Sequence, residues 1–184
     1  GHHVVGLDKN DPIKIIPDPR EEFSKNYLER SRMIVPDLRV KGGVAATYNH
    51  EDLALKLTSK AVTFIEQHRD QRFFLYFAHR NVHTPLLPNP RFAGKSVIGV
   101  FGDFITELDW SVGEVLSTLD RLKLTDNTLI VFTSDNGGAI KINGEPAIIS
   151  GHYLNGLLRG MKTEIWEGGS RVPFIARWPG NIPA

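Results

Sequence analysis

Two short apolar runs, separated by a long amphipathic stretch, constrain the fold more than any other feature of this chain. Residues 72–78 have the sequence RFFLYFA and residues 128–134 the sequence TLIVFTS. Continuous apolar runs of this length are typical of strands buried on both faces, as in parallel sheets covered by helices. Between them, residues 101–122 repeat apolar side chains at helical spacing, which predicts a helix. The order strand, helix, strand indicates the α/β class with right-handed crossovers.

Further elements are expected on both sides of this unit. Asn49 is a suitable N-cap for a helix, because apolar residues follow at helical spacing over residues 53–65. Another short strand is expected over residues 172–178. Residues 1–48 are punctuated by prolines, which predicts an irregular, loop-rich segment with one short helix near residues 21–32.

Composition excludes several classes of function. The chain of 184 residues has no cysteine, so disulfides, thiolate metal sites and a cysteine nucleophile are all excluded. Its 22 basic and 21 acidic residues give a net charge of +1, which offers no electrostatic basis for binding nucleic acid. No apolar run reaches the length of about 18 residues that predicts a membrane-spanning helix, and the first residues do not resemble an export signal.

A polar, glycine-rich segment follows the second apolar run directly. Asp135 and Asn136 offer oxygen ligands of the kind that calcium or magnesium takes, and Gly137 and Gly138 allow a sharp turn and leave space beside them. Ligands bind at the carboxyl ends of strands in open α/β sheets, so the segment is a candidate metal site. An Asx-type turn explains the same residues, and on these residues alone it is the favoured interpretation.

A histidine follows the first apolar run in a similar position. His83 lies in the segment NVHTP, where an imidazole can donate to an anionic oxygen or protonate a leaving group near neutral pH. His79 and His83 would form a metal pair on a helix, but Pro85 and the preceding strand argue against a helix here. Taken alone, His83 is better explained as a hydrogen-bonded loop residue.

A third polar segment precedes the last expected strand. Lys162 provides a mobile positive charge that suits a sulfate or phosphate oxygen, although most single lysines are solvated surface residues. Glu167 would orient Lys162 or cap the local turn, and Arg171 is better explained as a structural ion-pair partner than as a substrate contact.

Taken together and in this order, four segments resemble those of type I sulfatases, above all lysosomal arylsulfatases, galactosamine sulfatases and their bacterial relatives. The segments are residues 72–85, 102–109 (GDFITELD), 127–137 (NTLIVFTSDNG) and 162–173 (KTEIWEGGSRVP), the last followed by Trp-Pro-Gly at 178–180. The resemblance covers roughly residues 50–184. It implies an alkaline-phosphatase-like α/β/α sandwich with a mostly parallel sheet, incomplete at its N-terminal side. Residues 49–184 would then form part of the catalytic domain.

The resemblance also implies a chemistry. Sulfatases hydrolyse sulfuric esters with a formylglycine made from cysteine or serine, and one calcium ion helps to hold the sulfate. Matched by motif, Asp135 and Asn136 would be two of the calcium ligands, while His83 and Lys162 would bind the sulfate and act as catalytic residues. The implied substrate is a sulfated small molecule or glycan. Family members are exported to the periplasm, the lysosome or the outside of the cell.

The departures from the family pattern are as informative. The Cys/Ser-x-Pro-x-Arg signature of the nucleophile is absent, and the segment IPDPR at residues 16–20 has no cysteine or serine at the nucleophile position. The early Asp-Asp pair and the Gly-Lys-x-x-His-like segment are absent as well. All of these are expected upstream of Gly1. The chain alone is therefore expected to lack turnover, to expose an open sheet edge, and to need the missing N-terminal part of the same enzyme as its partner.

Two alternatives remain open at this point. A phosphatase or phosphodiesterase of the same superfamily would generally use two zinc or manganese ions with more histidine and aspartate ligands, whereas Asp135, Asn136 and Lys162 favour one calcium ion and a sulfate. A non-catalytic relic would bind sulfated glycans through Lys162 and His83 without releasing sulfate. Substrate specificity is expected to depend on residues 97–101 and 139–153.

Overall fold

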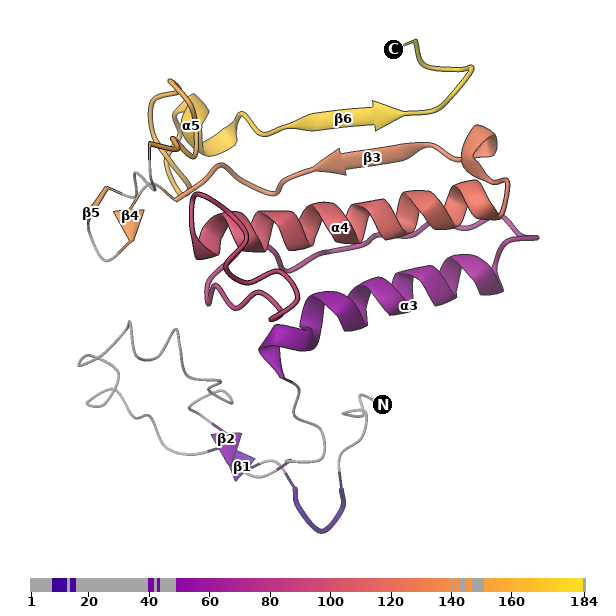
Figure 1. The fold of residues 1–184 in the computed structure, drawn as a ribbon, viewed down its shortest axis with the longest axis horizontal. Helices are drawn as coiled ribbons and strands as arrows, with labels where there is room; N and C mark the ends of the chain where they lie inside the picture. The colour runs from indigo at the N-terminus through magenta and orange to yellow at the C-terminus, as the bar shows by residue number, and fades with distance from the viewer. Residues whose placement is uncertain are drawn as a thin grey trace.

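Two packed helices and a pair of strands form the body of the chain in a computed structural model (Figure 1). The structure describes residues 8–12, 14–15, 40–41, 43, 49–139, 141–142, 145–146 and 151–183. The helix predicted near residues 21–32 lies outside the described residues. Within the described residues up to 43, the only strands are two-residue segments, β1 (Lys14–Ile15) and β2 (Val40–Lys41), which pair antiparallel.

The first long helix, α3 (Leu53–Gln67), begins where its capping signal predicts. Asn49 Oδ1 accepts a hydrogen bond of 3.1 Å from the Glu51 amide and so caps the 3₁₀ turn η2 (His50–Asp52), which leads into the helix. One face of α3 is buried through small or β-branched side chains at helical spacing: Ala54, Thr58, Ala61 and Ile65. Small side chains on this face allow the neighbouring helix to approach closely.

That neighbour is α4 (Val100–Arg121), which confirms the second predicted helix. Thr58 Oγ1 and Ser111 Oγ lie 2.6 Å apart between the two helices, so this buried polar pair is satisfied. Arg121 Nη2 of α4 also pairs with Glu66 Oε1 of α3 at 2.7 Å, on the exposed side of the contact. Phe104 and Leu119 of α4 are almost fully buried and belong to the core. No helix in the described part of the chain combines the length and the apolar character that crossing a membrane requires.

The predicted strands over residues 128–134 and 172–178 are present as β3 (Ile130–Thr133) and β6 (Phe174–Arg177), but they pair antiparallel. The prediction of a mostly parallel sheet is therefore not met by the strands that the structure describes. A parallel pair needs a crossover that returns the chain to its starting end, usually through a helix. The described part of the connection contains only short elements, namely β4 (Lys141–Ile142), β5 (Glu145–Pro146) and the four-residue helix α5 (Glu167–Ser170).

The strand predicted over residues 72–78 is wrong as a hydrogen-bonded strand. The segment runs behind α4 in Figure 1 without regular secondary structure. Its side chains nevertheless alternate: Phe74 and Tyr76 are 88% and 81% exposed, while Phe73, Leu75 and Phe77 are half-buried. Alternation is the pattern of a strand covered on one face only. The apolar composition of residues 72–78 thus reflects a segment whose two faces both need packing partners. The described residues pack against only one of these faces.

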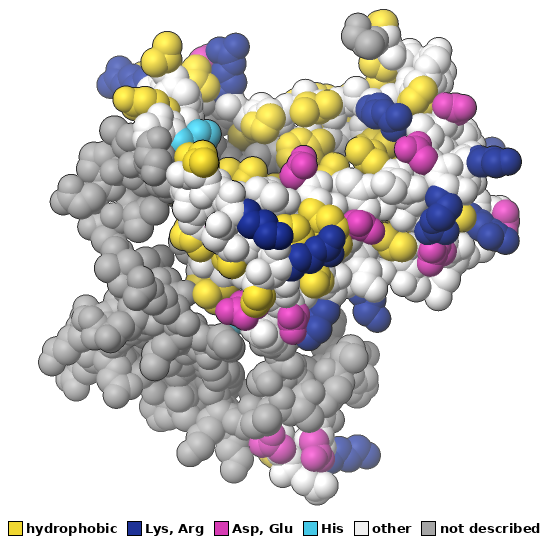
Figure 2. All heavy atoms as spheres, in the orientation of Figure 1, with side chains coloured by type: hydrophobic (Ala, Val, Ile, Leu, Met, Phe, Trp, Pro, Cys, Tyr) yellow, Lys and Arg dark blue, Asp and Glu magenta, His cyan; other side chains and the backbone are white. Residues whose placement is uncertain are grey.

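The β3–β6 pair exposes apolar side chains in the same way. Val131 and Phe174 are 47% and 69% exposed and share one face of the pair, because Phe174 pairs with Thr133, two residues along the strand from Val131. Figure 2 shows hydrophobic side chains over this pair of strands, while charged side chains are spread over the helices. Contiguous apolar surface of this kind marks an interaction face rather than a surface adapted to water. One side of the strand layer is therefore unpartnered within the described residues.

Candidate functional site

The loop that follows β3 is a tight turn closed by its own hydrogen bonds. Ser134 Oγ donates to the Asn136 carbonyl at 2.9 Å, and Asn136 Nδ2 donates to the Gly137 carbonyl at 3.0 Å. The amide oxygen of Asn136 accepts no hydrogen bond among the described residues, and Asp135 is exposed. The sequence allowed two interpretations of this segment, an Asx-type turn and a metal-binding loop. The two are compatible, because the turn leaves the Asp135 carboxylate and the Asn136 amide oxygen available as ligands.

Gly137 is required for contact between two loops rather than for an unusual backbone angle. Its amide donates to the Gly169 carbonyl at 2.9 Å, and a Cβ on Gly137 would lie 1.8 Å from the Gly168 carbonyl oxygen. No side chain fits into that distance. The space that the sequence predicted beside Asp135 is therefore occupied by the backbone of α5.

Lys162 lies beside this loop. Its backbone amide donates to the Gly138 carbonyl at 3.1 Å, which places Lys162 two residues from a candidate metal ligand through a single hydrogen bond. Within the described part of the chain the Lys162 ammonium has no acidic partner within salt-bridge distance. The next residue, Thr163, has φ +76°, which is rare for a β-branched residue. A positive charge without a fixed counter-ion is suited to binding an anion.

The short helix α5 contacts both the Asp135 loop and the segment that precedes Lys162. Arg171 Nη1 donates to Glu167 Oε2 at 3.0 Å, which confirms the prediction of a structural ion pair and leaves Glu167 without a role toward Lys162. The Gly168 amide donates to the Arg159 carbonyl at 2.7 Å, and the Arg159 guanidinium lies 3.6 Å from the centre of the Trp166 ring. These contacts hold the segment around Lys162 against α5.

His83 lies on a different loop, at the end of the extended segment. Its Nδ1 is 2.8 Å from the Thr84 carbonyl, a bond that is satisfied when Nδ1 carries the ring proton. Nε2 is then the free nitrogen, and the side chain is exposed. Among the described residues, no hydrogen bond or ion pair joins His83 to Lys162 or to residues 134–138. The structure thus brings two of the three predicted segments into direct contact.

A buried acidic side chain of α4 holds the His83 loop. Glu107 is 1% exposed, and its two carboxyl oxygens accept hydrogen bonds from Asn81 Nδ2 at 2.8 Å and from the Asn89 amide at 3.1 Å. Asn81 Nδ2 also donates to the Phe104 carbonyl at 3.0 Å. The loop is thereby bonded on both sides of His83 to a rigid helix.

A second acidic side chain of α4 holds the end of the same loop. Asp103 is 3% exposed and accepts hydrogen bonds from the amides of Gly94, Lys95 and Ser96 at 2.8, 2.9 and 2.7 Å. Burial by itself would raise the pKa of Asp103. The three amide donors and the charge of Lys95 outweigh it and hold this pKa below its ordinary value.

The lowered pKa of Asp103 predicts a dependence of stability on pH. A carboxyl with a depressed folded-state pKa contributes stability that is complete above its unfolded pKa and is lost as the pH falls through the folded one. Relative to the wild-type chain, Asp103→Asn is therefore expected to lose most stability near neutral pH and progressively less below about pH 4. Urea unfolding across this range, with exposed Asp109→Asn as the matched control, measures the difference. Parallel curves for Asp103→Asn and the wild-type chain would contradict the assignment.

His79 has become part of the fold rather than of a metal site. Its Nδ1 accepts a hydrogen bond of 3.1 Å from the Asn81 amide, so the ring proton lies on Nε2, which is buried without a partner among the described residues. Burial lowers the pKa of His79 to about 4. The ring is therefore neutral at physiological pH.

Three residues that hold the loops of the site were not predicted from the sequence: Asp103, Glu107 and Asn155. The first two are visible in principle, because they interrupt the apolar face of α4 four residues apart, where a charge needs a buried partner. Asn155 lies in a segment without periodicity, and its hydrogen bonds to Gly138 join residues 17 positions apart. Nothing local to the sequence indicates them.

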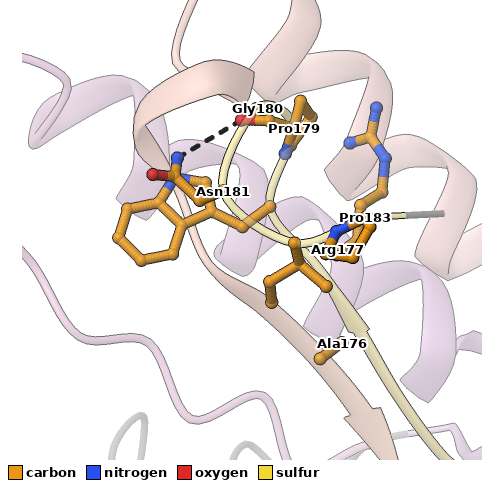
Figure 3. A pocket seen from close by; sticks show the side chains of 8 residues that line it. Ala176, Arg177, Pro179, Gly180, Asn181 and Pro183 are labelled. Atoms are coloured by element: carbon orange, nitrogen blue, oxygen red, sulfur yellow. Dashed lines mark hydrogen bonds between the residues drawn. The ribbon is translucent and has the colours of Figure 1, made fainter.

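Other features of the described residues do not compete with this site. No three His, Cys, Asp or Glu side chains in the described part of the chain gather closely enough to hold a metal ion by themselves. A hollow of about 630 Å³ is lined by residues 176–183 at the end of β6 remote from α5 (Figures 1 and 3). Of the residues that line it, Asn181 Nδ2 donates to the Pro179 carbonyl at 3.3 Å and Trp178 Nε1 donates to the Asp126 carbonyl at 3.0 Å.

Comparisons with known proteins agree on one family. The sulfatase family profile matches residues 17–184. An N-acetylgalactosamine-6-O-sulfatase of Bacteroides thetaiotaomicron is 41% identical over 98% of this chain and 39% of its own length. The steryl-sulfatase of Rattus norvegicus is 44% identical over 73% of this chain and 23% of its own length. The chain thus spans less than half the length of these relatives.

Solved structures give the same result. A structure from work on glycosaminoglycan metabolism by Bacteroides thetaiotaomicron superposes with a TM-score of 0.81 at 39% identity, over 97% of this chain and 41% of the other. A sulfatase from Pseudoalteromonas sp. superposes with a TM-score of 0.62 at 31% identity, over 78% of this chain and 29% of the other. With its two long helices, its antiparallel strand pair and its linked Asp135 and Lys162 loops, this chain belongs to the sulfatase family.

Proposed function

We propose that this chain carries the sulfate-binding half of a sulfuric ester hydrolase active site. The observation that carries the proposal is the hydrogen bond from the Lys162 amide to the Gly138 carbonyl, because it joins the residue that carries a positive charge to the loop that carries the two oxygen ligands. A sulfate ester has anionic oxygens that suit the ammonium and a cation bound to those ligands. Interactions of this kind bind and orient the sulfate group, and a donor aimed at the leaving-group oxygen gains strength as negative charge develops there.

Each of the proposed residues has a distinct task. Lys162 binds a sulfate oxygen as a point charge that no described acidic group neutralises. His83 keeps its ring oriented through Nδ1 and the Thr84 carbonyl, so that Nε2 is available to donate to a sulfate oxygen or to the leaving group once protonated. Glu107 and Asn81 hold the loop on which His83 lies.

The ligand chemistry of the Asp135 loop fits a calcium ion. Asp135 supplies an exposed carboxylate, and Asn136 supplies an amide oxygen that the turn leaves free. Calcium takes six to eight oxygen ligands, so these two are part of a larger set. When bound, the ion would offset the negative charge of the sulfate. Asp135 and Asn136 would hold it at the loop to which Lys162 is bonded.

The rest of the active site belongs to the polypeptide that the relatives have and these 184 residues lack. Residues 16–20 provide neither cysteine nor serine for a formylglycine nucleophile, so no step through that group is assigned to this chain. The exposed apolar surface of residues 72–78 (Phe74, Tyr76) and of one face of the β3–β6 pair (Val131, Phe174) would give the same polypeptide a place to pack. With a further layer on that surface the architecture would become the α/β/α sandwich expected from the family.

The substrate class proposed first is a sulfated amino sugar, since the 41% identical relative is named for N-acetylgalactosamine 6-sulfate. Export from the cytoplasm is proposed on the same family basis. Residues 97–101 and 139–153 remain the segments expected to adjust the site to a particular substrate.

Complementation tests the proposed function. The regions of the Bacteroides relative that lie outside its match to this chain are joined to or co-expressed with the chain, and sulfate release from N-acetylgalactosamine 6-sulfate is measured with and without calcium. Release that needs both parts is expected. A complemented protein that folds, binds the sulfated sugar and releases no sulfate would instead indicate a binding relic. Release of phosphate from the corresponding phosphate ester alone would indicate a phosphatase.

A further inference from the structure

The side chain of Asn155 joins two loops of the site through hydrogen bonds to Gly138 and Gly160. Its Oδ1 accepts a hydrogen bond of 2.7 Å from the Gly138 amide. Its Nδ2 donates to the Gly138 carbonyl at 3.0 Å and to the Gly160 carbonyl at 3.1 Å. Both N–H groups and the carbonyl oxygen of the amide are therefore used. No other uncharged side chain of this size offers one acceptor and two donors in one plane.

The same carbonyl of Gly138 also receives the Lys162 amide at 3.1 Å. Asn155 thus bonds the loop that carries Asp135 on one side and the residue two positions before Lys162 on the other. Four hydrogen bonds join these two loops to each other, and three of them belong to one side chain. Two backbone bonds, from the Gly137 amide to the Gly169 carbonyl and from the Gly168 amide to the Arg159 carbonyl, join each loop to α5 as well.

Apolar packing does little to fix this region. Leu157 is fully exposed, and Tyr153 and Ile165 are 60% and 91% exposed. Where few apolar contacts exist, the free energy of local opening is set by the hydrogen bonds that remain. The geometry around Lys162 therefore depends on hydrogen bonds, those of the Asn155 side chain among them, rather than on a hydrophobic core.

We propose that Asn155 is a positioning residue that holds Lys162 and the Asp135 loop in one fixed register, so that the ammonium and the oxygen ligands approach the same sulfate group. The benefit of this register for sulfate binding rests on the proposed function. The fixed relative position of the two loops does not rest on the proposed function, because it follows from the hydrogen bonds between them. Asn155 touches neither reacting group and acts through Lys162.

Amide hydrogen exchange of the 184-residue chain tests the register directly. Asn155→Asp has nearly the same shape, keeps the acceptor, and turns the donor toward Gly138 and Gly160 into an oxygen that repels both carbonyls. The protection factors of the Gly138 and Lys162 amides are expected to fall about tenfold or more. Protection of Ser111 and Leu119 in α4 serves as the internal reference, and exposed Asn127→Asp as the matched control. Unchanged protection at Gly138 and Lys162 would overturn the proposal.

A second variant covers the case in which Asn155→Asp unfolds the chain and lowers the α4 reference as well. A Cβ on Gly138 would lie 2.8 Å from Leu154 Cβ and 3.1 Å from Asn155 Oδ1, so Gly138→Ala forces a shift at Leu154 and moves the adjoining Asn155 side chain by a few tenths of an ångström. It is expected to lower Lys162 amide protection while the α4 reference stays constant. A constant Lys162 amide in this variant would also overturn the proposal.

A double-mutant cycle then separates positioning from a general structural role. Binding of N-acetylgalactosamine 6-sulfate is measured for Asn155→Asp, Lys162→Ala and the double variant. If Asn155 acts through Lys162, each single variant weakens binding about tenfold, and the double variant is no weaker than Lys162→Ala. Additive losses would mean that Asn155 contributes independently of Lys162 and would contradict the proposal. If the wild-type chain binds no sulfated sugar, the proposed function is in question, while amide exchange still decides the role of Asn155.

Discussion

Replacing Lys162 by alanine is expected to lower kcat/KM for sulfate release by about two to three orders of magnitude in the complemented protein. Lys162 has no acidic partner among the described residues and lies beside the Asp135 loop through its bond to Gly138. Removing a charge that faces the reacting group should therefore cost transition-state stabilisation while leaving the fold intact. Steady-state kinetics with N-acetylgalactosamine 6-sulfate give the value.

The control for this variant is Lys60→Ala, which removes an exposed lysine of α3 that forms no salt bridge with the described residues. Its kcat/KM is expected to equal that of the wild-type protein. The circular dichroism and urea midpoint of Lys162→Ala should also match the wild-type values, because the backbone bond to Gly138 does not depend on the side chain. A Lys162→Ala protein with undiminished turnover would exclude this lysine from the sulfate site.

Replacing Glu107 by alanine is expected to lower the free energy of unfolding by about 3 kcal/mol. The change leaves two buried donors, Asn81 Nδ2 and the Asn89 amide, without the carboxylate that accepts from them, and it opens a cavity at a position that is 1% exposed. Domains of this size have only about 5–15 kcal/mol of stability, so the loss is a large share. Urea unfolding measures it from the midpoint, provided that the slope is unchanged.

Two comparisons make this prediction specific to the buried network. Glu114→Ala, an exposed site two turns further along α4, should change the unfolding free energy by less than about 0.5 kcal/mol. Glu107→Gln keeps an acceptor toward one of the two donors and should lose clearly less than the alanine variant. Equal effects at Glu107 and Glu114 would show that the bonds from Asn81 and Asn89 do not hold the loop around His83.

Helix α3 and the face of α4 could be predicted because their signals are local. Asn49 caps the turn before α3, and apolar side chains recur within one helical turn of each other on both helices. The Arg171–Glu167 ion pair was predictable for the same reason, since its partners are four residues apart. Hydrogen bonds and contacts of this range need no knowledge of the rest of the chain.

Strand pairing could not be predicted in the same way. The apolar run at residues 72–78 satisfies the composition of a buried strand, yet a strand exists only where a neighbour supplies hydrogen bonds, and no described residue does so here. Residues 130–133 and 174–177 did become strands, but their antiparallel direction follows from a connection that returns at the same end. The assignments of Asp135, Asn136, His83 and Lys162 to metal and sulfate stay predictions.

By itself, then, the sequence determined the two long helices, the local ion pair and, through four ordered segments, membership of the sulfatase family. Only the tertiary structure decided that Lys162 adjoins the Asp135 loop, that Gly137 must lack a side chain, and that Glu107 and Asn155 hold the two parts of the site. The physical reason is range. Glu107 and Asn155 act through hydrogen bonds to residues 26 and 17 positions away, and such distances in sequence close only when the whole chain has packed.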